Sequence, residues 1–108
     1  MENSRIEQIK AFLKDTPQDA FLNYALAIEY IGLDESDKAK SIFIQLLDWH
    51  PDYTATYYHH GKLLLKEGKK EDAISIFNIG IKKAELQKEL HTAAELRSAL
   101  NEILYDDE

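Results

Sequence analysis

Cysteine is absent from this 108-residue sequence, and its absence excludes several kinds of site. A chain without cysteine has no disulfide framework, no thiolate metal ligand and no cysteine nucleophile. Long apolar segments are missing as well, because the unbroken apolar runs extend over only a few residues, far short of the roughly 18 that span a bilayer. The N-terminal stretch MENSRIEQIK also lacks the apolar core of a signal peptide. We therefore expect a cytoplasmic protein without a membrane partner.

Positive charge is scarce relative to negative charge. The 13 Lys and Arg residues are outnumbered by 20 Asp and Glu residues, which gives a net charge of -7. Binding to nucleic acid is driven mainly by clustered Lys and Arg side chains that neutralise phosphates. We therefore expect no nucleic acid among the partners.

Glycine and proline are rare, with four and two residues, and Pro17, Gly32, Pro51 and Gly68 fall between periodic apolar segments. This arrangement is typical of helices joined by short turns, so the sequence predicts an all-α protein. The stretch SRIE reads as a capping box that begins the first helix at Ser4, and in TPQD we expect Thr16 to cap a helix that begins at Pro17. The six predicted helices run from Ser4 to residue 14, from Pro17 to near Gly32, from the end of DESD to about Trp49, from Pro51 to Gly68, from Lys70 to the mid-80s and from Lys88 to Leu104.

One short segment of the sequence occurs twice in nearly the same form. The stretch AKSIF at residues 39–43 returns as AISIF at residues 73–77, an interval of 34 residues. When residues 17–50 are laid on residues 51–84, the identical positions are Pro17 and Pro51, Tyr24 and Tyr58, Ala39 and Ala73, Ser41 and Ser75, Ile42 and Ile76, and Phe43 and Phe77. Each unit reads as helix, turn, helix. Helical pairs of this length bury their apolar faces by stacking on neighbours into a solenoid.

The repeated positions resemble those of a tetratricopeptide repeat. The matching residues are Leu26, Ala27, Tyr30, Ala39, Phe43 and Pro51 in the first repeat, and His60, Gly61, Leu64, Ala73 and Phe77 in the second. The resemblance covers residues 17–84 and implies antiparallel helix-turn-helix repeats stacked as a short right-handed α-solenoid. It also implies that Ala39 and Ala73 lie where the two helices of each repeat cross closely. The sequence departs from the family pattern at Asn23, where a large aromatic residue is expected, and at Glu85, where a third junction proline would come.

The whole chain, residues 1–108, is expected to form a single domain. Its predicted parts are an N-terminal half-repeat helix at residues 4–14, repeat 1 at residues 17–50, repeat 2 at residues 51–84 and a C-terminal capping helix at residues 88–104. The last helix has one apolar and one polar side, which keeps the end of a solenoid covered.

The helix that follows Pro17 is apolar on two sides. One stripe of helical spacing includes Leu26 and Tyr30 and belongs to the predicted core, whereas a second stripe begins about 200° of rotation away. The second stripe consists of Phe21, Tyr24, Ile28 and Ile31, and one period later of Ala55, Tyr58, Lys62 and Leu65. The resemblance implies that these first helices line a concave face that binds an extended peptide or a partner helix, with His59 and Lys66 at one side.

The leading hypothesis is a protein–protein interaction module, an adaptor or scaffold, that binds a partner protein with this surface. Family members that bind chaperone C-termini use a clamp of Lys, Asn and Arg, which is missing here because Tyr24 and Ile28 stand where Lys and Asn would be needed. An apolar or aromatic ligand segment with an acidic residue near Lys62 and Lys66 fits better. Two alternatives would cover the same stripe: a terminal helix of the chain, or a second copy of the chain in a homodimer.

Residues for catalysis or metal binding are sparse. His59 and His60 are adjacent, and adjacent helical side chains point about 100° apart, so the pair cannot hold one metal ion as an i, i+4 pair can. We expect His60 to pack in the core, and DESD lacks the spacing and central glycine of an EF-hand loop. The sequence therefore predicts no catalytic residue, metal or cofactor, and an enzyme using His59 or His60 is the weakest of three hypotheses. Trp49 is expected to pack near Tyr53 at the junction of the repeats.

Overall fold

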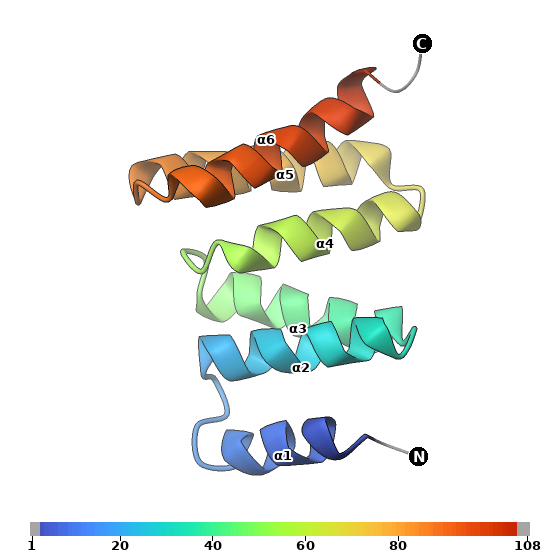
Figure 1. Ribbon diagram of the computed structural model, residues 1–108, viewed down its shortest axis with the longest axis vertical. Coiled ribbons are helices and arrows are strands. Elements are labelled where there is room, and N and C mark those ends of the chain that lie inside the picture. Colours follow the sequence, from blue (N-terminus) through green and yellow to red (C-terminus); the bar gives the residue numbers. More distant parts are fainter. Residues whose placement is uncertain (1–2, 106–108) are drawn as a thin grey trace. The chain divides into compact units, whose positions relative to one another are not determined.

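The structure of the protein is a computed structural model that describes residues 3–105 (Figure 1). These residues form six α-helices and no β-strand. The helices are α1 (Ser4–Leu13), α2 (Ala20–Gly32), α3 (Ser36–Trp49), α4 (Ala55–Lys66), α5 (Lys70–Leu86) and α6 (Leu90–Tyr105). The prediction of an all-α protein with six helices is confirmed.

The helices divide into two compact units of three helices each. The first unit ends at Tyr53 and contains α1, α2 and α3, and the second begins at Thr54 and contains α4, α5 and α6. Each unit holds one helix pair joined by a short turn, α2 with α3 or α4 with α5, together with one flanking helix (Figure 1).

In the first unit α2 packs against both α1 and α3. The core consists of side chains that are at most 8% exposed, namely Ile6, Ile9, Leu26, Ala27, Tyr30, Ala39, Phe43 and Leu46. Both neighbouring helices also reach the ring of Tyr30, because Lys10 Nζ of α1 lies 6.0 Å and Lys38 Nζ of α3 lies 5.3 Å from its centroid. Ala39 and Phe43 are fully buried, which agrees with the positions that the family resemblance assigns to them.

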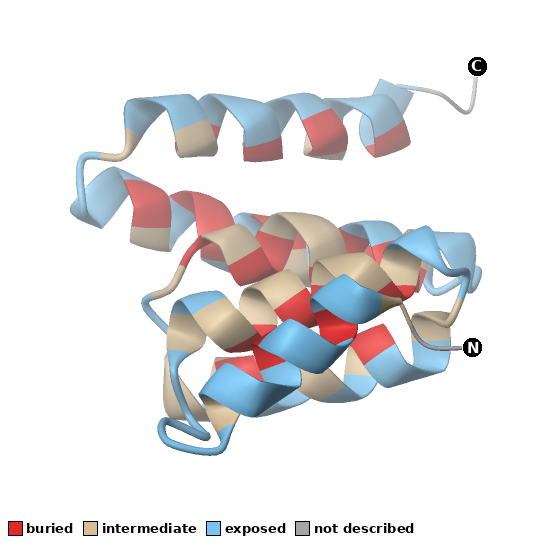
Figure 2. Ribbon diagram, turned by 60° about the horizontal axis from the view of Figure 1, so that its bottom comes forward, coloured by how far each residue is buried: buried red, intermediate tan, exposed pale blue. Residues whose placement is uncertain are grey.

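In the second unit α5 packs against α4 and α6, and α4 also contacts α6. Glycines allow the closest approaches. A Cβ placed on Gly61 would overlap the buried ring of Phe77, and a Cβ placed on Gly80 would lie 2.6 Å from the Cβ of Tyr57. Helix α6 is amphipathic, with one side exposed and the other side buried through Ala93, Leu96, Ala99 and Ile103 (Figure 2).

Helix α2 begins at Ala20, so the predicted start at Pro17 with a cap at Thr16 is wrong. Its cap is Asp19, whose carboxylate accepts a hydrogen bond from the backbone N–H of the third helical residue at 2.8 Å. The side-chain amide of Asn23 donates to the carbonyl oxygens of Pro17 and Asp19 at 3.0 and 2.8 Å. Because these bonds hold the segment before the helix as a turn, the polar Asn23 is satisfied although it is only 5% exposed.

Helix α1 is capped by the residue before the predicted one. The Oδ1 atom of Asn3 accepts from the backbone N–H of Ile6 at 2.7 Å, and Ser4 is already helical. The predicted capping box at Ser4 is therefore wrong. Asn3 is as good a cap as serine, since its side-chain oxygen satisfies the same unpaired N–H groups of the first turn.

The later helices also begin within a few residues of their predicted starts. Helix α3 starts inside DESD at Ser36, α4 starts at Ala55 instead of Pro51, and α6 starts at Leu90 instead of Lys88. The starts of α4 and α6 move toward the C-terminus because a turn precedes the first helical residue, whereas the start of α3 moves toward the N-terminus.

Three helices end in the same way. The residue after the C-cap has a positive φ, 60° at Asp34 after α2, 80° at Gly68 after α4 and 61° at Lys88 after α5. In each turn the following N–H reaches back to a helix carbonyl, from Glu35 to Tyr30 at 2.9 Å, from Lys69 to Leu64 at 2.9 Å and from Glu89 to Ala84 at 2.8 Å. This is the Schellman closure, in which a left-handed residue satisfies the last carbonyls of the helix.

Candidate functional site

The four predicted residues on α2 form one surface, which we call the α2 patch: Phe21, Tyr24, Ile28 and Ile31. The side chain of Phe21 is 64% exposed, and the other three are half-buried. On the opposite side of the helix, Leu26 and Tyr30 are at most 7% exposed. Helix α2 is therefore apolar both toward the core and toward the surface of its unit.

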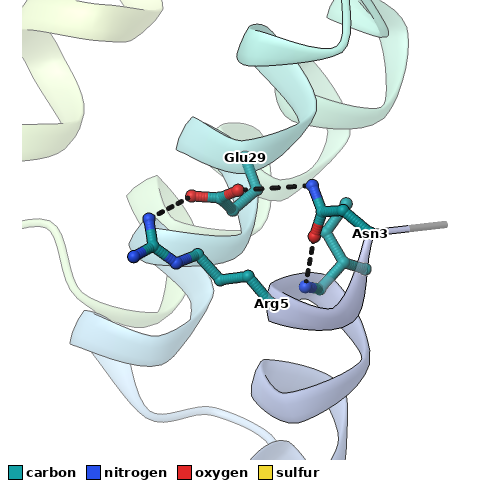
Figure 3. Close-up of polar contacts among 4 residues, drawn as sticks. Asn3, Arg5 and Glu29 are labelled. Atoms are coloured by element: carbon teal, nitrogen blue, oxygen red, sulfur yellow. Dashed lines mark hydrogen bonds and ion pairs between the residues drawn. The ribbon is translucent and has the colours of Figure 1, made fainter.

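Helix α1 packs beside this patch, against the side of α2 that carries Glu29. Arg5 Nη1 lies 3.3 Å from one carboxylate oxygen of Glu29, and the amide of Asn3 donates to the other at 3.4 Å (Figure 3). Asn3 thus caps its own helix and also contacts α2. The α2 patch keeps exposed surface while α1 is bound, so the N-terminal helix does not bury it.

One edge of the α2 patch is formed by two tyrosines. The rings of Tyr24 and Tyr53 meet edge to face, with their centroids 5.8 Å apart. Burial, and to a lesser extent the negative charge of Asp19, raises the pKa of Tyr53 above its ordinary value of 10.0. The phenol of Tyr53 therefore stays neutral at physiological pH and offers a polar tip beside an apolar surface.

The predicted residues on α4 form a second surface, the α4 patch: Ala55, Tyr58, His59, Lys62, Leu65 and Lys66. Lys62 and Lys66 are exposed and the other four are half-buried. Lys62 Nζ lies 5.8 Å from the centroid of the Tyr58 ring, within the range of a cation–π interaction. The α4 patch thus combines an aromatic ring with positive charge, whereas the α2 patch has no charged member.

His59 lies at the side of α4 that faces α6. Its ring meets the ring of Tyr58 edge to face at 5.1 Å. Burial lowers the pKa of His59 below its ordinary value of 6.5; the charge of Glu95 on α6 opposes this shift, and that of Lys62 reinforces it. The imidazole is therefore neutral at physiological pH and supplies no positive charge to the α4 patch.

The remaining histidine of the α4 pair, His60, lies in the core. His60 is 5% exposed, so the expectation that it packs in the core is confirmed. Within residues 3–105, no group of three or more His, Asp or Glu side chains is placed to hold a metal ion. The same part of the chain contains no helix of the length and apolarity needed to cross a membrane.

The sequence reading missed a third surface, which we call the Trp49 site. Two hollows of about 580 and 340 Å³ are both lined by Trp49. Residues 16–19 line the first, and Ala20 with residues 50–53 lines the second. Trp49 and Tyr53 line the same hollow, so the expectation that they are neighbours is confirmed. The sequence offers only the tryptophan itself as a signal for this site, because it predicts residues 17–19 as the start of a helix with Thr16 as its cap.

Comparison with solved structures gives clear matches. A tetratricopeptide repeat domain protein from Salinibacter ruber, in a crystal structure, is 34% identical with a TM-score of 0.79, and the match covers 82% of this chain and all of that chain. The chain belongs to the tetratricopeptide repeat family. A solution structure of a tetratricopeptide repeat domain protein from the same organism is 35% identical over 85% of this chain and 92% of that chain, with a TM-score of 0.78.

A more distant match supports the fold alone. The solution structure of a protein from Bordetella parapertussis has a TM-score of 0.82 at 22% identity and covers 99% of this chain and 92% of that chain. No protein-family model matches the sequence, and no curated protein does. Tetratricopeptide repeat domains are typically non-catalytic, and the matches support a protein–protein interaction module in general.

Proposed function

We propose that this tetratricopeptide repeat protein binds a peptide or helix of a partner protein through the α2 patch and the α4 patch. The observation that supports the proposal is the α2 patch itself. Four apolar side chains, with Phe21 64% exposed, lie on a helix whose opposite side is already in the core. Folding of the unit does not need this surface to be apolar, whereas binding does. In the family, the corresponding helices line the concave, ligand-binding face.

The chemistry of the two patches defines the ligand. Aromatic rings such as Tyr24 and Phe21 offer large contact areas at a low cost in side-chain entropy, so they favour an apolar or aromatic ligand segment. Lys62 and Lys66 on the α4 patch favour an acidic residue in that segment. The neutral His59 adds no charge, so the preference for an acidic residue rests on the two lysines.

The experiment that tests this proposal is peptide selection with a charge placed inside the α2 patch. A displayed peptide library is selected on the purified protein, and the selected peptides are titrated into wild type, Ile28→Glu and Ile44→Glu. Ile44 is the matched control because it is 51% exposed on α3, outside both patches. We expect Ile28→Glu to weaken binding by about a hundredfold, because a buried carboxylate would oppose an apolar ligand, while Ile44→Glu binds as wild type does. Equal binding by all three proteins would show that the ligand sits elsewhere.

A homodimer that buries the α2 patch is the second candidate function. The same exposed apolar side chains favour it, since a second copy can cover them as well as a partner can. Sedimentation of wild type, Ile28→Glu and Ile44→Glu over a wide concentration range separates the two functions. Dimers in wild type and in Ile44→Glu but not in Ile28→Glu would assign the patch to self-association.

A further inference from the structure

The Trp49 site is a preformed recess that the proposed function does not use. The half-buried Trp49 lines both of its hollows, one with the loop before α2 and the other with the loop after α3. All of the lining residues belong to the first unit. The site contains none of the four residues that define the α2 patch, although Tyr53, which lines one hollow, contacts Tyr24 of that patch.

The two loops around Trp49 are bonded to each other and to α2. The Nε2–H of His50 donates to the carbonyl oxygen of Gln18 at 2.5 Å, which joins the loop after α3 to the loop before α2. Asp19 caps α2, and the amide of Asn23 bonds the carbonyls of residues 17 and 19. Because these hydrogen bonds already order the two loops, binding of a ligand costs little free energy for loop ordering.

The rim of the Trp49 site is acidic. Asp19 lines one hollow and Asp52 lines the other, and Asp15 and Asp48 lie one residue outside the lining segments. All four carboxylates belong to exposed residues, and the basic residues among residues 14–19 and 48–53 are Lys14 and His50, whose Nε2 is bonded to the carbonyl oxygen of Gln18. A cationic ligand therefore gains electrostatic energy on approach, whereas an anionic one is repelled.

We propose that the Trp49 site binds an arginine side chain from a basic segment of a partner protein. A guanidinium is planar, so it can stack on the indole of Trp49 and donate paired hydrogen bonds to a carboxylate at the rim. The compact ammonium of lysine offers only the electrostatic attraction, without the planar stacking and the paired hydrogen bonds. This ligand differs in charge from the acidic segment that the α4 patch favours, so the two surfaces would engage different parts of a partner.

Tryptophan fluorescence tests the proposal directly, because Trp49 is the only tryptophan in the chain. The purified protein is titrated with a short Gly/Ser peptide that contains two arginines, with the same peptide carrying lysines, and with a proline-rich peptide without charge. We expect a saturable change in emission with the arginine peptide at a Kd below about 1 mM. The lysine peptide should bind about fivefold more weakly, because it loses the stacked and bidentate contacts.

Charge-removing variants locate the binding. Asp19→Asn keeps a good helix cap and removes one rim charge, and Asp52→Asn removes a charge from the other hollow. Each should weaken the arginine peptide about threefold, whereas Asp37→Asn, an exposed aspartate in the first turn of α3, should leave it unchanged. Circular dichroism checks that each variant is folded. The proposal is overturned by the absence of a saturable change, by equal binding of the lysine peptide, by tighter binding of the proline-rich peptide, or by equal loss in Asp37→Asn.

Discussion

Gly80 of α5 lies so close to Tyr57 of α4 that a methyl group on the glycine would stand 2.6 Å from the tyrosine Cβ. The same methyl group would be 3.1 Å from Leu96 Cδ1 of α6. Tyr57 is 3% exposed and Leu96 is fully buried, so neither can move aside into solvent. The packing of α5 against both neighbours in the second unit therefore depends on a missing side chain.

We expect Gly80→Ala to destabilise the protein by about 1 to 3 kcal/mol, although alanine is the better helix former. Urea unfolding followed by circular dichroism measures the change. The matched control is Gly32→Ala at the end of α2, where a new Cβ would meet nothing within 4 Å. That control should be neutral or stabilising by up to about 1 kcal/mol. Equal stability of the two variants would show that α4 and α6 can move away from α5 at little cost in free energy.

The same pair of positions shows why the fold was predictable from the sequence. One period earlier than Tyr57 and Gly80, the chain has Asn23 and Leu46, and all four residues are buried. Asn23 is smaller than Tyr57, whereas Leu46 is larger than Gly80. The two repeats therefore keep the same register although the side-chain volumes at these two positions differ in opposite directions. The interval of 34 residues and the small buried residue at Ala39 and Ala73 are the same in both repeats. The helical repeats were therefore predictable without an exact match to the family pattern.

The helix boundaries and the Trp49 site were harder to predict. Pro17 is a good first helical residue, but the hydrogen bonds from the side chain of Asn23 hold the segment before α2 in a turn. Helix propensity does not predict such side-chain hydrogen bonds. Because the sequence predicts a helix from Pro17 onward, the recess that residues 16–19 form next to Trp49 could not be foreseen. The α2 patch was predictable because helical spacing alone places its four residues on one side of the helix.

The three Schellman turns predict stabilising substitutions. Lys88 has a φ of 61°, a conformation that costs a residue with a side chain about 1 kcal/mol relative to glycine. We expect Lys88→Gly to stabilise the protein by about that amount and Asp34→Gly by less, since aspartate tolerates this region better. Gly68→Ala should destabilise by about 1 kcal/mol at the equivalent turn. Thermal unfolding of the three variants checks the set, and a loss of stability in Lys88→Gly would mean that its side chain is needed elsewhere.

The pH dependence of stability should carry a contribution from His59. Its pKa is lowered in the folded protein, so the folded state binds this proton less readily than the unfolded state does. The resulting stability is fully present above the ordinary pKa of 6.5 and is lost as pH falls from there toward the folded pKa. We expect His59→Gln to flatten the decline in unfolding free energy below that pH. NMR titration of wild type and Glu95→Gln provides a second check, because removal of the carboxylate should lower the pKa of His59 further.

Attachment of α1 to α2 should depend more on Asn3 than on Arg5. Asn3 caps α1 and also donates to Glu29, whereas the side chain of Arg5 is 73% exposed in its ion pair with the same carboxylate (Figure 3). We expect Asn3→Ala to cost about 1 kcal/mol through the lost cap and Arg5→Ala less than about 0.5 kcal/mol, because water screens an exposed pair.

Asn3→Asp separates the two roles of Asn3, because it keeps the cap but places a carboxylate opposite Glu29. If the cap dominates, urea unfolding should show Asn3→Asp close to wild type and Asn3→Ala well below it. A loss in Arg5→Ala equal to that in Asn3→Ala would instead place the attachment in the ion pair. That result would matter for binding, since α1 covers the side of α2 next to the α2 patch, and its release would widen the apolar surface open to a partner.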